Sequence, residues 1–295
     1  MRKKKNYENI KWYTFLVPAL IFYVIFFWVP FFISFGYSFT DWDGVRANFI
    51  GLQNYIELFQ DEEILSASKN TLFYTVTITL IQNILGLACA VAFRKSNAKN
   101  NVLRTIMFLP YIFSNLVISY MFRFVFEPNT GSLNYYLEAL HLESWKLSWL
   151  SDPALARWVV VFACVYRCMG YTMVINIAGL QGISESYYEA AILDGASKWQ
   201  QFKTVTFPLM APATTINIVL CLIGNIQMYD QIYAITGGGP GYSTEAIANT
   251  VYRLGFGSGG SRWGYGAAMS VVMFLVIMIF TVFVTNMLRK REVEA

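Results

Sequence analysis

Hydrophobic positions in this chain gather in long blocks that short polar segments separate. Six blocks reach about twenty residues or more, the length that an α-helix needs to cross the hydrocarbon core of a bilayer. These blocks are residues 12–39, 70–93, 105–126, 158–180, 213–235 and 264–288. The pattern predicts an all-α, polytopic membrane protein with six transmembrane helices in one domain, residues 12–288. The first block follows a basic start, but it is too long for a signal peptide and no small-residue cleavage site follows, so we expect an uncleaved span.

The charges beside these blocks predict an orientation. Closely spaced Lys and Arg lie at the amino terminus, between blocks two and three, between blocks four and five, and after the last block, whereas the other three connections hold most of the acidic residues. Because cytoplasmic loops carry the excess of Lys and Arg, the termini (1–11 and 289–295) are expected in the cytoplasm. The connections 40–69, 127–157 and 236–263 are then external, the first with a short helix near residues 54–59.

Composition and missing motifs exclude several kinds of protein. Charged residues make up 14% of the chain, against about a quarter in soluble domains, and the basic ones lie beside apolar blocks, which gives no indication of nucleic-acid binding. The four cysteines fall inside apolar blocks and the single histidine lies in a polar loop, so neither disulfides nor a metal site are predicted. The chain has no phosphate-binding Gly-x-x-x-x-Gly-Lys-Ser/Thr motif. We therefore expect no ATPase or other enzyme activity in this chain alone, and read the Gly-rich run 237–241 as a tight external turn.

One polar connection contains a short stretch with small side chains, Glu-Ala-Ala-Ile-Leu-Asp-Gly-Ala at 189–196. Its residues are mostly good helix formers, and Gly195 permits a break or a very close contact. Helical spacing places Glu189, Leu193 and Ser197 on one face. A short exposed helix with a small-residue face is suited to fit into a groove of another protein.

The stretch EAAILDGASKWQQFKTVTFPLMAP resembles the EAA loop of the membrane subunits of ABC importers. In that pattern Glu-Ala-Ala is followed by Gly six residues after the Glu and later by Leu-Pro, and here Phe207 stands before Pro208. Further elements resemble the carbohydrate-importer branch, whose members include subunits for maltose, raffinose-type oligosaccharides and glycerol phosphate. These elements are GLQNY at 51–55, NT at 70–71, RT at 104–105 with LP at 109–110, GSLN at 131–134, AGLQ at 178–181 and ITGGGP at 235–240.

This resemblance implies a permease that moves a carbohydrate, with an oligosaccharide favoured, by alternating access. It implies that the EAA loop, 181–212, carries a coupling helix seated in a groove of a separate ATPase. The residues implied in this coupling are Glu189, Ala190, Ala191, Asp194 and Gly195. The implied partners are a second related permease, ATPase subunits that bind ATP and magnesium, an extracytoplasmic sugar-binding protein and the lipid bilayer of a bacterial or archaeal cytoplasmic membrane. No cofactor is implied in this chain.

Polar residues inside the blocks are candidates for the substrate pathway, because such residues are costly in a membrane and mark function. The candidates are Tyr171, Asn225, Tyr229, Arg167, Gln227 and Asp230. Arg167 with neighbouring tyrosines could grip a sugar, or it could pair with Asp230. Asn225 and Tyr229 are four residues apart and are expected to share a helix face, as are Gln227 and Gln231. The resemblance adds that the helices before and after the EAA loop line the pathway.

Three other functions remain as alternatives. An importer of the same type could carry another solute, such as glycerol phosphate. An ion-coupled secondary transporter would need buried acidic residues in several spans, and Asp230 is the main one found. A membrane scaffold would leave the polar residues of the fifth block unexplained.

Overall fold

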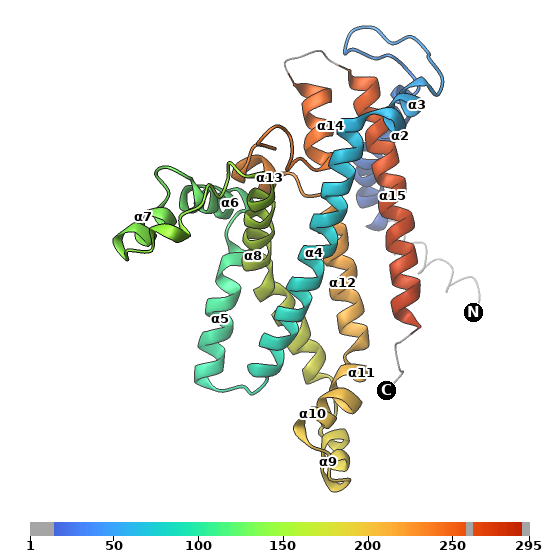
Figure 1. Ribbon diagram of the computed structural model, residues 1–295. Coiled ribbons are helices and arrows are strands. Elements are labelled where there is room, and N and C mark those ends of the chain that lie inside the picture. Colours follow the sequence, from blue (N-terminus) through green and yellow to red (C-terminus); the bar gives the residue numbers. More distant parts are fainter. Residues whose placement is uncertain (1–14, 258–261, 291–295) are drawn as a thin grey trace, which may run out of the picture. The chain divides into compact units, whose positions relative to one another are not determined.

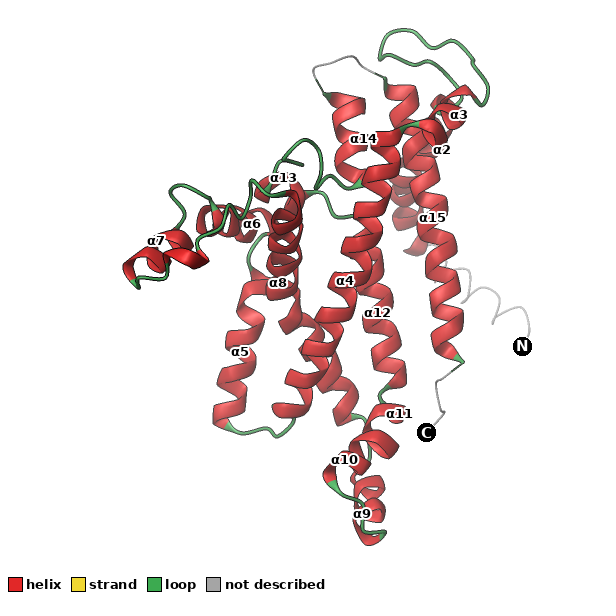
Figure 2. Ribbon diagram, in the orientation of Figure 1, coloured by secondary structure: helices red, strands yellow, loops and turns green. Residues whose placement is uncertain are grey.

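The computed structural model describes residues 15–257 and 262–290, and this part of the chain is helical with no strand (Figures 1 and 2). An isolated antiparallel bridge joins Thr40 to Phe49. The elements after the first helical turns are η1 (Val24–Trp28), α2 (Val29–Tyr37), α3 (Gln53–Gln60), α4 (Glu62–Ala92), α5 (Ala98–Ile112), α6 (Asn115–Phe126), α7 (Ser132–Ala139), η2 (Glu143–Trp145), α8 (Pro153–Gln181), α9 (Glu185–Leu193), α10 (Lys198–Gln201), η3 (Phe202–Thr206), α11 (Phe207–Leu209), α12 (Ala211–Ile226), α13 (Asp230–Ile235), α14 (Ile247–Phe256) and α15 (Trp263–Arg289). The predicted cytoplasmic amino terminus, 1–11, lies outside the described residues, and so do residues 291–295 of the predicted carboxyl terminus, 289–295.

Four helices are long and apolar enough to cross a membrane, and there are six spans if each of two bent helix pairs counts as one. The four are Phe15–Tyr37, α4, α8 and α15. The all-α membrane fold is thus confirmed, and α3 confirms the short helix expected near residues 54–59. Helix α4 begins earlier than predicted, because Glu62 and Glu63 form its first turn, where carboxylates interact favourably with the helix dipole.

The third block, the predicted span 105–126, is broken into two helices. Helices α5 and α6 meet at 95°, and Phe113 and Ser114 between them are extended, with ψ of 148° and 146°. The break frees the carbonyl group of Phe113, which accepts a hydrogen bond from Nε of Arg167 at 3.4 Å. A distant part of the chain supplies this hydrogen bond, so the local sequence does not reveal it.

The fifth block is also interrupted. Helix α12 ends at Ile226 and α13 begins at Asp230, so no continuous helix face joins Asn225 to Tyr229, or Gln227 to Gln231. The prediction that these pairs share faces is wrong. The side chain of Asn249 donates a hydrogen bond to the Tyr229 carbonyl oxygen at 3.2 Å, which satisfies a backbone group at the interruption.

The described chain forms two compact units. The larger unit, 62–250 with 275–295, is built around α4 and α8, which pack along each other with α5 and α12 beside them (Figure 1). Close approach depends on glycines: a Cβ added to Gly86 would lie 2.5 Å from the Thr172 side chain, and one added to Gly170 would collide with the Met107 carbonyl group. These contacts bring α4 and α5 against α8 more closely than side chains would allow.

Of the described residues, the smaller unit comprises 15–61, 251–257 and 262–274. Asn54 in α3 donates hydrogen bonds to the carbonyl oxygens of Ser38 and Thr40 at 2.9 and 2.8 Å. Arg262 makes a two-pronged ion pair with Glu57, at 2.7 and 2.6 Å, and Glu57 raises the pKa of this guanidinium. These contacts fix α3 against the chain that follows α2 and against the start of α15.

Candidate functional site

Helix α9 is defined at both ends by local sequence. Ser184 caps its amino end by accepting a hydrogen bond from the Ser186 amide. At the other end Gly195 has a positive φ of 75°, the amide of Gly195 donates to the Ile192 carbonyl at 3.0 Å, and that of Ala196 donates to the Ala191 carbonyl at 2.9 Å. This is the Schellman arrangement, in which a left-handed glycine ends a helix.

The Schellman turn also corrects one expectation. Ser197 does not continue the face of Glu189, because it begins the next helix, α10, as its cap. The Ser197 amide donates to Oε1 of Gln200 at 2.7 Å while the Gln200 amide donates to the Ser197 hydroxyl group. Glu189 and Leu193 still lie on one face of α9.

The coupling residues named from the sequence lie on an open surface. Helix α9 has no buried side chain, and Leu193 and Ile192 are 88% and 56% exposed. The residues Glu189, Ala190, Asp194 and Gly195 are exposed and Ala191 is half-buried. In Figure 1, α9 and α10 extend beyond the ends of α8 and α12, at the same end of the unit as the α4–α5 turn. The helix thus presents small and apolar side chains on the surface of the described chain.

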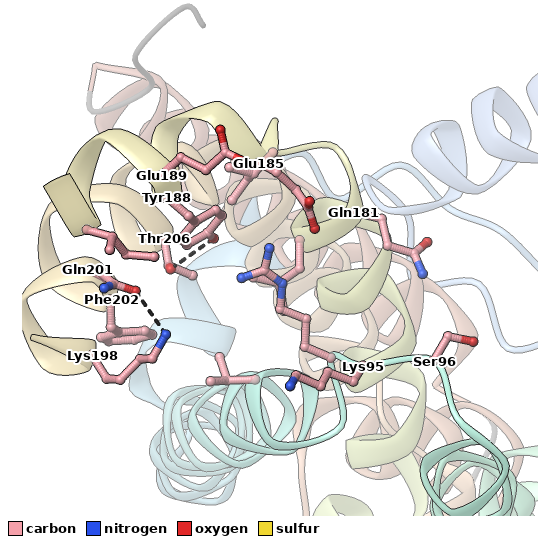
Figure 3. A pocket seen from close by; sticks show the side chains of 15 residues that line it. Lys95, Ser96, Gln181, Glu185, Tyr188, Glu189, Lys198, Gln201, Phe202 and Thr206 are labelled. Carbon is pink, nitrogen blue, oxygen red and sulfur yellow. Dashed lines mark hydrogen bonds between the residues drawn. The ribbon is translucent and has the colours of Figure 1, made fainter.

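A cavity of about 740 Å³ lies between α9, α10 and the end of α4 (Figure 3). Its lining contains charges of both signs: Arg94, Lys95, Lys198, Glu185 and Glu189. In Figure 3 the Tyr188 hydroxyl group points to that of Thr206, and these oxygens are 3.1 Å apart. The cavity therefore has an aromatic and polar wall formed by α9 and η3.

Two pathway candidates, Arg167 and Tyr171, lie on α8 and contact α5. The rings of Tyr171 and Tyr111 stack with centroids 4.6 Å apart and planes at 16°. The Arg167 guanidinium lies 5.0 Å from the centroid of the Tyr111 ring. No ion pair between Arg167 and Asp230 occurs in the described chain, so the geometry favours an aromatic contact over the pairing considered from sequence.

The other candidates lie where α12 gives way to α13. Asn225 donates a hydrogen bond to Oγ1 of Thr79 on α4 at 3.0 Å, and Gln227 is exposed. Tyr229 stacks on Tyr233, with centroids 5.5 Å apart. Asp230 is in the first turn of α13, half-buried. The helix break, rather than one helix face, brings polar groups to this place.

Sequence reasoning missed Tyr111 and the polar interior of α4. Gln82 is buried and donates a hydrogen bond to Oγ1 of Thr172 at 2.8 Å. A glutamine inside an apolar block was a usable signal, as was a tyrosine directly after Pro110. Among the described residues no group of three or more His, Cys, Asp or Glu could hold a metal ion.

Comparison with known proteins supplies the family. The model of the family described as binding-protein-dependent transport system inner membrane component matches residues 82–293. The chain belongs to this family. It is thus a permease subunit, and in such ABC systems ATP is hydrolysed by a separate chain.

Curated relatives cover nearly the whole permease. It is 34% identical over 295 residues to the probable starch degradation products transport system permease protein AmyD of Thermoanaerobacterium thermosulfurigenes, covering 99% of each chain. It is 31% identical to the multiple sugar-binding transport system permease protein MsmF of Streptococcus mutans, covering 95% of this chain and 96% of that one. It is 32% identical to the sn-glycerol-3-phosphate transport system permease protein UgpA of Agrobacterium fabrum, covering 95% and 94%.

A solved structure has the same fold as the permease. A chain of a bacterial ABC transporter involved in the import of the acidic polysaccharide alginate superposes with a TM-score of 0.85, covering 98% of this chain and 99% of that one. A chain of the bacterial alginate ABC transporter in complex with an alginate pentasaccharide-bound periplasmic protein also gives 0.85, covering 97% and 96%. Identities of 22% and 23% make this a likeness of fold.

Proposed function

We propose that this permease imports a carbohydrate, specifically an oligosaccharide, by alternating access around a site near the middle of the membrane. Relatives named for starch degradation products and for multiple sugars support this substrate class. The stacked pair Tyr111 and Tyr171 with Arg167 supports it too, because aromatic faces and guanidinium donors suit sugar rings and hydroxyl groups.

The energy comes from ATPase subunits that dock on α9 and bind ATP and magnesium. The observation that carries this assignment is the exposure of α9, whose nine residues bury no side chain. Small residues Ala190 and Ala191 permit close approach, and Gly195 ends the helix sharply. The EAA loop, 181–212, is thus a coupling segment, and it passes the movement of the ATPase subunits to the helices on either side of it.

A second related permease completes the translocation pathway, and an extracytoplasmic sugar-binding protein delivers substrate. The end of the permease that carries α9 faces the cytoplasm of a bacterium or archaeon, and so do both chain termini. The connections 40–69, 127–157 and 236–263 face the binding protein. The clustering of Lys and Arg beside the predicted inner ends supports this orientation.

The pathway residues have distinct roles in this proposal. Tyr171 offers a ring face to the sugar, and Arg167 donates hydrogen bonds to hydroxyl groups. Asn225, Gln227, Tyr229 and Asp230 lie around the break between α12 and α13. Non-helical backbone at membrane depth is tolerated only where protein buries it or where it lines a water-filled cavity, which supports a place for these residues on the pathway.

The test is purification of the permease with its co-purifying subunits in mild detergent, followed by reconstitution with the sugar-binding protein. We expect a soluble ATPase and a second permease to co-purify, and labelled oligosaccharides such as maltotriose to accumulate in vesicles only with ATP. A permease that purifies without any ATPase, and that moves sugar on an ion gradient alone, would contradict the proposal.

Glycerol phosphate is the second candidate substrate, favoured by the likeness to the Agrobacterium fabrum relative and by the cationic Arg167. A competition assay separates the two candidates. Excess unlabelled glycerol phosphate should leave oligosaccharide uptake unchanged, whereas complete inhibition with no uptake of any sugar would assign the phosphate ester.

A further inference from the structure

The coupling helix is attached to the rest of its unit by few contacts. It lies between two glycines, Gly182 and Gly195, that end helices α8 and α9. Only Tyr188 and Ala191 of its nine residues are even half-buried. A helix with so few contacts would rotate about its flanking turns when the ATPase moves it, and the membrane helices would not move with it. Transmission therefore requires a stiff contact between α9 and the membrane helices.

Tyr188 makes that contact with both its ring and its hydroxyl group. Its ring packs on the buried cluster that includes Leu180, Ile183 and Met210. The guanidinium of Arg94, just after α4, lies over the ring at 4.2 Å from its centroid. The Tyr188 hydroxyl group reaches that of Thr206 in η3 at 3.1 Å. One side chain of α9 thus contacts both flanks of the coupling segment.

Arg94 is itself tied to α5. The Arg104 side chain donates hydrogen bonds to the carbonyl oxygen of Phe93 at 3.1 and 2.5 Å, and to that of Arg94 at 2.9 Å. These charge-assisted bonds hold the turn after α4 against α5. Helix α5 carries Tyr111 in its last turn, where that ring stacks on Tyr171 of α8.

We propose that Arg94 and Tyr188 form a cation–π clamp that positions α9 and passes its movement through Arg104 and α5 to the Tyr111–Tyr171 pair. The clamp rests on the proposed function, because it requires an ATPase that pushes α9. Its residues do not touch ATP or sugar and act by positioning. The guanidinium is attracted to the face of the ring, so this contact holds α9 to the turn after α4.

The measurement is sugar uptake per ATP hydrolysed, in vesicles that contain the complete transporter with its binding protein. Loss of a partly desolvated cation–π contact should lower this ratio about fivefold in Arg94→Gln and in Tyr188→Leu. The double variant should be no worse than either single one, because both remove the same contact. Arg94→Lys and Tyr188→Phe, which keep a cation and a ring, should stay within about twofold of the parent.

The matched control is Lys99→Gln, which removes an exposed cation from the first turn of α5, away from the Tyr188 ring. The ATPase subunits should co-purify with each variant in parental amounts.

An unchanged ratio of uptake to ATP hydrolysis in Arg94→Gln and Tyr188→Leu would overturn the clamp. Uptake and ATPase activity that fall together in proportion would also overturn it, since that marks a loss of structure. Losses that multiply in the double variant would overturn it too. If Arg94→Gln does not assemble, Tyr188→Leu alone decides. Failure of the proposed function is distinct: the parent would then show no ATP-driven uptake.

Discussion

The coupling segment and the polar interior between α4, α8 and α12 belong to the same unit, yet they are held in opposite ways. Helix α9 keeps its side chains on the surface and relies on its capping turns and on Tyr188. The interior holds Gln82 and Thr172 at 3% and 0% exposure, joined by a hydrogen bond of 2.8 Å. Asn217, also buried, donates to the Thr172 carbonyl oxygen at 3.2 Å.

This difference predicts how each region responds to change. Substitutions in α9 should change the surface that the proposed ATPase partner contacts while leaving the fold intact, because α9 buries no side chain. Substitutions in the interior leave a buried polar group without its partner, which costs about 1–3 kcal/mol. Function and stability should therefore separate in the first region and move together in the second.

The largest effect is expected at Gly170, in the packed interior. A Cβ there would meet the backbone of Met107 and would lie 2.8 Å from Cα of Phe108, and backbone cannot move aside as a side chain can. Gly170→Val should destabilise the permease by about 3 kcal/mol or more and lower its yield in the membrane. Thermal aggregation in detergent measures the change.

Gly224→Ala is the matched control for this prediction, because nothing lies within 4 Å of a Cβ added there. Its yield should equal that of the parent. A Gly170→Val permease with parental melting behaviour would show that α5 and α8 are less closely packed than they are here.

The next effect is expected at Gly195, in the exposed region. No atom lies within 4 Å of a Cβ there, but φ is 75°, a conformation that costs a β-branched residue about 1–2 kcal/mol. Gly195→Val should unwind the end of α9 while yield and melting stay parental, and ATP-driven uptake should fall about tenfold.

Gly195→Asn should retain most uptake, because asparagine tolerates the left-handed conformation. If Gly195→Val lowers yield and uptake together, the coupling segment would be part of the folding core, and the contrast between the two regions would disappear.

Local sequence determines the ends of the exposed helices but not the packing of the interior. Gly195 was expected to permit a break, and it ends α9 through bonds to near neighbours. Ser184 and Ser197 cap α9 and α10 through equally local bonds, although Ser197 had been expected to continue the face of Glu189. The breaks at Phe113 and after Ile226 were not expected. Arg167 satisfies a backbone group at the first break and Asn249 one at the second, and such partners are set by tertiary structure.

Candidate residues for the pathway follow the same division. Tyr171 was found because it lies on the helix before the coupling segment, but its stacking partner Tyr111 comes from another helix. Asn225 was found as a polar residue in an apolar block, but Thr79, which accepts its hydrogen bond, is 146 residues away. Sequence identified one member of each pair and could not identify the contact.

A smaller effect is expected at Tyr171, whose side chain is half-buried, less exposed than α9 and more exposed than Gln82 and Thr172. Tyr171→Ala removes the ring that stacks on Tyr111, a contact of about 0.5–1.5 kcal/mol. The substrate concentration at half-maximal uptake should rise about fivefold, with the ATPase subunits still bound. Tyr171→Phe keeps the ring and should stay near the parent value.

A related prediction compares Asn225→Ala with Thr79→Val. Both variants remove the hydrogen bond between Asn225 and Thr79, the first by removing the donor and the second by removing the acceptor. If Asn225 binds substrate, only its own substitution should weaken uptake. Equal losses in the two variants would assign Asn225 to packing between α12 and α4.

The smallest effect is a pH dependence of stability, which we expect in a surface turn at Glu127 and not in the polar interior. Glu127, at the end of α6, accepts hydrogen bonds from the amides of Thr130 and Asn129, at 2.5 and 2.9 Å, and from the Thr130 hydroxyl group at 2.9 Å. The Thr130 bonds hold the pKa of this carboxyl below its ordinary value of 4.5. Since the folded pKa is depressed, the turn is fully stabilised above pH 4.5 and loses that stabilisation as pH falls through the lowered pKa.

Hydrogen exchange of the Asn129 and Thr130 amides, corrected for the intrinsic effect of pH, should therefore show protection at pH 6 that declines below pH 4.5. Glu127→Gln should remove the pH dependence, because its amide does not titrate in this range. The interior amides of α4 around Gln82 should keep their protection throughout, since Gln82 and Thr172 carry no titrating group there. Parallel loss in both places would mean that acid opens the whole unit, and that the surface turn is no less stable than the polar interior.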